Sequence, residues 1–241
     1  DSIDLITNWF GNVDNGSADD FLDLFSFINN NDLSIKSNYE AVENRMDIDN
    51  FIDYQIFQIF IINYDWPANN MKCWRANQKG SKWRWIFYDG DAGLYNTEYK
   101  IFEHAMSEAV KDWPTNAVAT LFFRKLLENQ VFKDKFFYRL EQVLNNDLAY
   151  STLKPLFLSI FEEIKPEISL QSKRFAKPLS DANWYASMGN IDNFLSLMPC
   201  VIKESVKKIF DVDLYITSCD GSKPNKDIKD IVLYPNPNRG T

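Results

Sequence analysis

A long apolar segment that stops at a proline constrains this chain more than any other feature of its sequence. Within residues 47–62 apolar side chains recur at helical spacing, at Ile48, Phe51, Ile52, Ile56, Ile59 and Phe60. Asp47 or Asp49 can cap the start of this helix. Pro67 cannot continue it, because proline lacks a backbone donor and biases the preceding Trp66 away from helical angles. The sequence therefore predicts a buried central helix that ends in a polar loop.

A tryptophan-rich hairpin follows that loop. Residues 71–76 and 82–88 read as two short strands around the polar turn 77–81. Alternation places Trp83, Trp85 and Phe87 on one face of the second strand. The strand runs into the small, polar sequence DGDAG at residues 89–93. Because the hairpin folds the chain back, we expect this loop and the loop after the central helix to meet at one end.

The remaining sequence is mostly helical in pattern. Apolar periodicity predicts further helices over residues 18–29, 39–46, 99–110, 116–129, 133–145, 151–164, 166–175 and 191–210. Residues 1–17 read as an irregular lead-in, 217–229 as a linker, and 230–241 as a short apolar strand followed by proline and asparagine. The expected fold class is α+β, predominantly α-helical, with one main domain over residues 18–216.

Composition excludes several functions. The chain is 45% hydrophobic and 15% aromatic, enough for a large core. A net charge of −8 gives no electrostatic footprint for nucleic acid and repels anionic membranes. No apolar run is long enough for a transmembrane segment. Three cysteines without a CxxC pair, and a single histidine, argue against a zinc site and against a disulfide framework.

Acidic and amide side chains gather at the two predicted loops. Asp65 and Asn70 have the D-x-x-x-x-N spacing of a kinase catalytic loop, and Asp91 begins a D-x-G sequence further on. Phosphoryl transfer needs a carboxylate to accept the proton of the attacking hydroxyl and oxygen ligands to hold magnesium. Asp65 and Asn70 could equally be ordinary turn residues, because the spacing alone occurs often by chance.

The sequence motifs around these residues are more specific. Four stretches resemble the CotH kinase family over roughly residues 18 to 212: MDIDNFIDYQ at 46–55, NYDWPANNMKCWR at 63–75, KWRWIFYDGDAG at 82–93 and LFFRKLLEN at 121–129. Known members of that family are spore-coat kinases that phosphorylate proteins on serine, and some fungal relatives are surface invasins. The resemblance implies a protein-kinase-like C-lobe whose hairpin carries the metal-site loop, with ATP and Mg²⁺ or Mn²⁺ as cofactors.

The resemblance also assigns roles. It makes Asp65 the catalytic carboxylate, Asn70 a metal and cofactor ligand, and Asp91 the main metal ligand with Asp89 assisting, although the sequence does not decide between the two. Lys72 and Arg75 are candidate phosphate contacts in the cofactor site. The plainer interpretation is that the first is a solvated strand lysine and the second an ion-paired arginine.

The sequence departs from the family pattern at several positions, among them Ala68, Cys73 and Phe175, and more strongly at its front. Ala92 stands where many members carry phenylalanine, and no G-x-G-x-x-G precedes Asp65. The resemblance places the phosphate-gripping lysine, its glutamate partner and the covering loop upstream of this segment. We expect a longer parent protein. A catalytically silent surface-binding or adhesion module is therefore the alternative to a kinase, and a carbohydrate-processing enzyme with paired carboxylates is a weaker one.

The tail gives a separate indication. Residues 231–240, IVLYPNPNRG, resemble the start of the C-terminal sorting domain of type IX secretion in Bacteroidetes-like bacteria. The resemblance implies a secreted or cell-surface protein. Together with the kinase-like sequence, it leads us to expect a protein substrate or a surface partner. It also implies that most of the sorting domain is missing from this sequence. The oligomeric state cannot be predicted from these residues.

Overall fold

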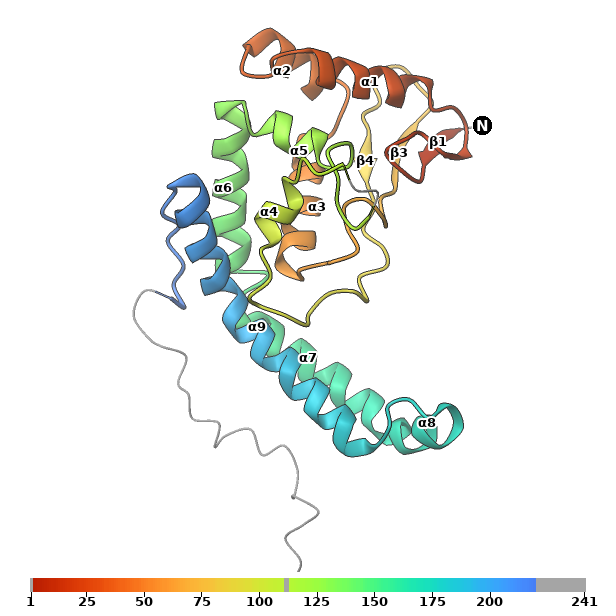
Figure 1. Ribbon diagram of the computed structural model, residues 1–241, viewed down its shortest axis with the longest axis vertical. Coiled ribbons are helices and arrows are strands. Elements are labelled where there is room, and N and C mark those ends of the chain that lie inside the picture. The colour runs from red at the N-terminus through yellow and green to blue at the C-terminus, as the bar shows by residue number, and fades with distance from the viewer. Residues whose placement is uncertain (1, 111–112, 220–241) are drawn as a thin grey trace, which may run out of the picture. The chain divides into compact units, whose positions relative to one another are not determined.

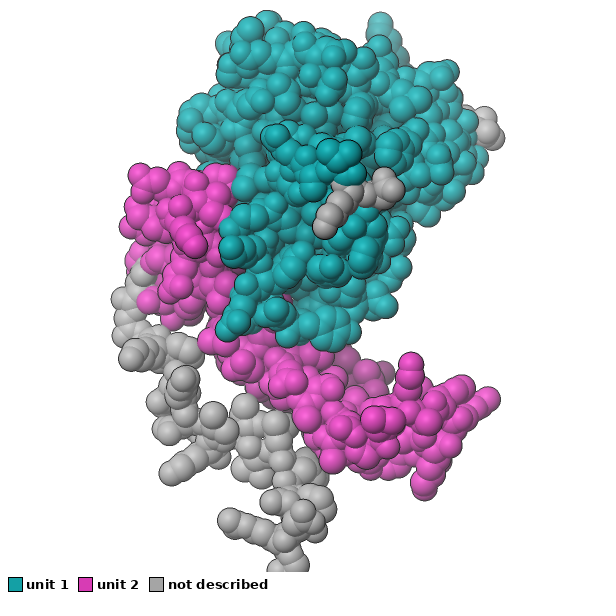
Figure 2. All heavy atoms as spheres, in the orientation of Figure 1, with its two compact units in different colours: residues 1–140 teal, residues 141–241 magenta. Residues whose placement is uncertain are grey.

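The computed structural model describes residues 2–110 and 113–219, and the chain divides into two compact units. Unit 1 is Asp1–Leu140 and unit 2 is Glu141–Thr241 (Figures 1 and 2). The tail sequence at 231–240 and most of the predicted linker at 217–229 lie outside the described residues. Within the described part of the chain, no helix is both long and apolar enough to cross a membrane.

A small antiparallel sheet lies at the start of unit 1. Its strands are β1 (Ile3–Ile6), β2 (Val13–Asn15), β3 (Cys73–Ala76) and β4 (Arg84–Trp85), in the order β2-β1-β3-β4. The predicted hairpin is confirmed, since β3 and β4 pair with Cys73 opposite Trp85. The predicted irregular lead-in over 1–17 is wrong. Ile6 pairs with Cys73, so β1 finds its partner far along the chain, where no local pattern reveals it.

Within the described residues, six helices begin in unit 1. They are α1 (Asp19–Asn30), α2 (Lys36–Glu43), α3 (Ile48–Phe60), α4 (Ile101–Ala105), α5 (Leu121–Leu126) and α6 (Gln130–Asn145). The central helix is close to its predicted bounds, and α4 and α5 are shorter than the predicted 99–110 and 116–129. The Asp47 side chain caps α3 by accepting from the Asn50 backbone N–H at 3.1 Å. That cap satisfies one of the donors that a helix start leaves unpaired.

Aromatic side chains join α3 to the hairpin. Phe51 on α3 lies edge-on to Trp85, with ring centroids 4.7 Å apart. Trp83 and Trp66 are fully buried. Burying one large apolar side chain contributes about 1.5–3 kcal/mol to stability. These contacts therefore hold α3 against β4. Phe87, predicted on the same face as the two tryptophans, is 41% exposed.

Unit 2 is a helical hairpin with a short cap. It contains α7 (Tyr150–Ile164), the 3₁₀ turn η1 (Lys165–Glu167), α8 (Ile168–Phe175) and α9 (Asp181–Phe210). Phe161 of α7 stacks on Trp184 of α9 with ring centroids 4.8 Å apart. The Ser180 hydroxyl caps α9, so this helix starts well before the predicted residue 191. A disulfide joins Cys200 to Cys219. The fold is α+β and mainly helical, as predicted.

Candidate functional site

Two loops of unit 1 meet beyond the end of α3. The loop after α3 is bonded to the loop after β4 through its backbone: Leu94 N–H donates to Ile61 O at 2.7 Å, and Tyr64 N–H donates to Ala92 O at 3.2 Å. A Cβ on Gly93 would lie 2.9 Å from Ile61 O, so only glycine permits this approach. The end of the central helix and the end of the hairpin therefore form one continuous polar surface.

Asp65 lies in the first of these loops with both carboxylate oxygens engaged. Its Oδ2 accepts from Asn69 Nδ2 at 3.0 Å and from Asn70 Nδ2 at 3.2 Å. Its Oδ1 accepts from the indole Nε1 of Trp113. The side chain is half-buried, and these three donors fix the plane of the carboxylate.

Asn70 links the two loops. It is 6% exposed and has a left-handed backbone with φ of 53°, a conformation that asparagine tolerates better than most residues. Its Nδ2 donates both to Asp65 and to Asp89 O, the second at 3.2 Å. Because both amide hydrogens face acceptors, Oδ1 is left as the free end. No residue in the described part of the chain donates to it.

Asp89 and Asp91 are exposed on the second loop. A side-chain hydrogen bond to Asp91 and the negative charge of that neighbour raise the pKa of the Asp89 carboxyl, and burial and Asp65 add in the same direction. The Tyr95 hydroxyl holds this loop by donating to Asp91 O at 2.9 Å. The negative charges of Asp65 and Asp91 therefore both act on the Asp89 carboxyl.

Comparison with known families decides the affiliation of the chain. The family model described as CotH kinase protein matches residues 7–198. The chain belongs to the CotH kinase protein family. Searches of curated proteins and of solved structures gave no match. The matched residues include both of the loops described above. Membership of the CotH family makes this chain a kinase-like protein.

The donors of this CotH site suit a divalent cation such as Mg²⁺. Magnesium prefers oxygen ligands, is held by one or two carboxylates, and completes its shell with water and substrate phosphates. Asp89, Asp91 and the Asn70 amide oxygen offer that chemistry from two adjoining loops. Among the residues described, no three His, Cys, Asp or Glu side chains gather closely enough to hold a metal by themselves. An ion here would therefore need the amide and the phosphates as well as the carboxylates.

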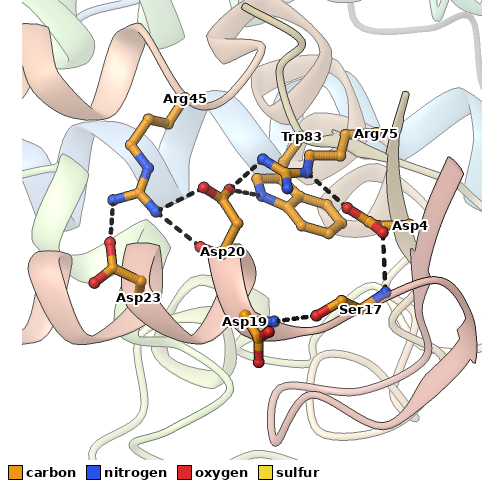
Figure 3. A network of polar contacts seen from close by, with 8 residues as sticks. All are labelled: Asp4, Ser17, Asp19, Asp20, Asp23, Arg45, Arg75 and Trp83. Atoms are coloured by element: carbon orange, nitrogen blue, oxygen red, sulfur yellow. Dashed lines mark hydrogen bonds and ion pairs between the residues drawn. The ribbon is translucent and has the colours of Figure 1, made fainter. Parts of the chain in front are cut away.

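The two predicted phosphate contacts of the CotH chain are paired with acids. Lys72 Nζ lies 3.0 Å from Asp14 Oδ2 and 5.3 Å from the centre of the Tyr88 ring, beside Asp89. Arg75 is further occupied in a network that Figure 3 shows. Lys72 thus contacts Tyr88, which directly precedes Asp89 in the sequence, whereas the contacts described for Arg75 are with Asp4, Asp20 and Trp83. Their roles as phosphate ligands stay predictions.

The Arg75 network connects the sheet to α1. Its guanidinium lies 3.0 Å from Asp4 Oδ2 and 2.6 Å from Asp20 Oδ2, and 5.2 Å from the Trp83 ring centre. Asp20 also accepts from Trp83 Nε1 at 2.9 Å and pairs with Arg45 at 3.4 Å (Figure 3). The Asp4 side chain is only 3% exposed, so this arginine neutralises a buried charge.

A cluster of aromatic residues that sequence patterns did not mark as functional supports the loop that carries Asp65. The buried His104 bonds through Nε2 to Trp66 O, which can only accept, so Nε2 carries the hydrogen and Nδ1 accepts from Tyr99 Oη at 2.8 Å. The Tyr64 ring stacks on His104, and Trp113 lies edge-on to Tyr64. With both ring nitrogens engaged, the histidine anchors the loop that carries Asp65.

Proposed function

We propose that this CotH-family chain carries the phosphoryl-transfer site of an extracytoplasmic protein kinase, which uses ATP and Mg²⁺ or Mn²⁺ to phosphorylate serine or threonine hydroxyls of a protein. The observation that supports it best is the Asn70 amide, which bonds to the Asp65 carboxylate and to Asp89 O at the same time. Through it the candidate base and the candidate metal loop are held in one place. Such positioning is most of what phosphoryl transfer asks of a protein.

Each residue has a defined task in this proposal. Asp65 accepts the proton of the substrate hydroxyl as the new O–P bond forms and the bond from the γ-phosphorus to ADP breaks. Asn69 and Asn70 hold the carboxylate in orientation through Oδ2. Asp91, with Asp89 and the Asn70 amide oxygen, would hold the divalent cation. The bound cation supplies positive charge that neutralises the phosphates and stabilises the transferring group.

We further propose that the protein is exported by a type IX-like route to the bacterial surface. The resemblance at 231–240 supports this proposal, although those residues lie outside the described structure. The Cys200–Cys219 disulfide supports it independently, because structural disulfides persist mainly in oxidising, extracytoplasmic compartments.

The test separates metal binding from chemistry with two carboxylate-to-amide variants. ATP is titrated into the full-length protein by calorimetry with and without Mg²⁺, and transfer to dephosphorylated casein is followed by mass spectrometry. We expect Asp91→Asn to weaken Mg²⁺-dependent ATP binding at least about tenfold, because it removes a charged ligand of the cation. We expect Asp65→Asn to bind ATP normally and to lose roughly 10²- to 10⁴-fold in transfer rate, the contribution of a general base.

Asp49→Asn is the matched control, since this carboxylate is on α3 and its side chain is 86% exposed. It should leave binding and transfer unchanged. If the full-length protein, which by the family resemblance also carries the upstream lysine and glutamate, binds no ATP in the presence of Mg²⁺, the kinase proposal is contradicted and the silent surface module is favoured. Transfer by Asp65→Asn at the wild-type rate would contradict the role of that carboxylate.

A further inference from the structure

A short segment, residues 113–115, lies against the loop that carries Asp65. Pro114 O accepts from Ala68 N–H at 3.1 Å. The Thr115 hydroxyl donates to His104 O at 2.7 Å, and the Trp113 indole donates to Asp65 Oδ1. Three successive residues are therefore bonded to the site loop or to its anchor, which makes this contact more than a chance approach of one side chain.

The Trp113 ring is held although it is 52% exposed. It lies edge-on to the Tyr64 ring, with centroids 5.4 Å apart and planes at 80°. Tyr64 is fixed in turn between His104, at 6.0 Å, and Tyr99, at 5.3 Å. The indole N–H thus reaches Asp65 from a ring whose orientation is set by packing, which limits the directions that the carboxylate can take.

The hydrogen bonds of Asp65 leave one direction for a substrate. Each carboxylate oxygen offers about two acceptor positions. Asn69 and Asn70 occupy those of Oδ2, and Trp113 occupies one of Oδ1. The remaining position on Oδ1 is the one at which a hydroxyl proton can be accepted, and it lies beside the indole.

We propose that Trp113 is the positioning residue for the catalytic carboxylate, and that the acceptor hydroxyl reaches Asp65 alongside its exposed ring. This inference rests on the proposed function, because it assigns a partner to the base of that reaction. Trp113 takes no proton: the substrate hydroxyl gives its proton to Oδ1, while the indole N–H keeps its hydrogen and holds that oxygen in place. Its effect therefore falls on transfer to the acceptor and spares ATP binding.

The first test is Trp113→Phe, which removes the N–H but keeps an aromatic ring against Tyr64. We expect kcat for transfer to dephosphorylated casein to fall about tenfold or more, as for one lost hydrogen bond to a charged group, with KM for ATP unchanged. Trp113→His, which retains a ring N–H, should recover part of the loss. Trp74→Phe, a change at a half-buried tryptophan on β3, is the matched control and should be neutral.

A second measurement reads the hydrogen bond without any activity. The indole ¹⁵N–¹H resonance that disappears in Trp113→Phe belongs to Trp113, and it should move upfield in Asp65→Asn, where the acceptor loses its charge. An indole signal that ignores this substitution would overturn the inference, and so would full transfer activity in Trp113→Phe. A resonance that responds in a protein that transfers no phosphate would instead contradict the proposed function, and with it the role of Trp113 in that reaction.

Discussion

At the scale of single residues, His104 shows how one buried group holds a functional loop. It is the only histidine of the chain, and it bonds through one nitrogen to Trp66 O and through the other to Tyr99. Burial lowers the pKa of its imidazole, although the bond to Trp66 acts in the opposite direction. A protonated ring would also carry a hydrogen on Nδ1, which needs an acceptor there in place of the donor that neutral His104 uses.

This arrangement predicts an acid-sensitive fold. Because the pKa of His104 is lower in the folded than in the unfolded chain, the unfolded chain takes up the proton first as the pH falls below about 6.5. The free energy of unfolding should therefore decrease as the pH falls below about 6.5. His104→Gln should flatten that decrease while costing about 1–3 kcal/mol at pH 8 through lost hydrogen bonds. Urea titrations of both proteins across this range measure it, and equal slopes would contradict it.

The residues of the candidate site differ in how well the sequence alone predicts their place in it. A single hairpin joins the two loops that carry Asp65, Asn70, Asp89 and Asp91. Residue spacing and the motifs of the family were therefore enough to propose that the loops meet. Trp113 is 48 positions from Asp65, and its contact depends on how the segment after the second loop folds back. No spacing rule relates such a tryptophan to a carboxylate, and the sequence could mark it only as one more apolar side chain.

At the scale of elements, local patterns predicted what local forces build. The central helix α3 combines an apolar face with the Asp47 cap, and both signals lie within the element itself. The strand β1 has only the short sequence Ile3–Ile6, and it becomes a strand by pairing with β3. The first turns of α9 are reinforced by packing distant in sequence, that of Trp184 on Phe161, although the Ser180 cap at their start is a local signal that apolar periodicity does not reveal.

The Arg75 network predicts a large stability effect from one substitution. Arg75→Met should lower the free energy of unfolding by about 3 kcal/mol or more, because it leaves the buried Asp4 carboxylate without its cation. Lys36→Met is the control. It breaks the ion pair between Lys36 and Glu40, whose side chains are 88% and 53% exposed respectively, and should cost under about 0.5 kcal/mol. Denaturant unfolding compares the two variants, and similar losses would contradict the structural role.

The same variant also tests Arg75 as a phosphate contact. If the role of Arg75 is purely structural, the Kd for ATP should be unchanged in the folded Arg75→Met protein. An increase of Kd by tenfold would show that the sequence-based assignment was right and that the ion pairs open when nucleotide binds.

At the scale of the whole molecule, the family match and the disulfide cover different parts of the chain. The match ends at residue 198, within α9, whereas the disulfide joins Cys200 to Cys219 beyond it. After α9, Tyr215 O accepts from the side chain of Asn145, also in unit 2, at 2.7 Å, and Leu214 and Ile216 are buried. The disulfide therefore fastens a segment that the family pattern does not include, and it lies wholly within unit 2.

This placement predicts that oxidation stabilises one unit selectively. Cys219→Ser should lower the stability of unit 2 by about 3 kcal/mol, the chain-entropy effect of a crosslink of this span. Dithiothreitol should remove the difference between wild type and variant, which controls for the serine itself. The third cysteine, Cys73, does not interfere, because burial raises the pKa of its thiol and keeps it protonated. Hydrogen exchange should show the loss of protection at residues 141–219 and none at 2–110, and a loss spread equally over both units would contradict a local crosslink.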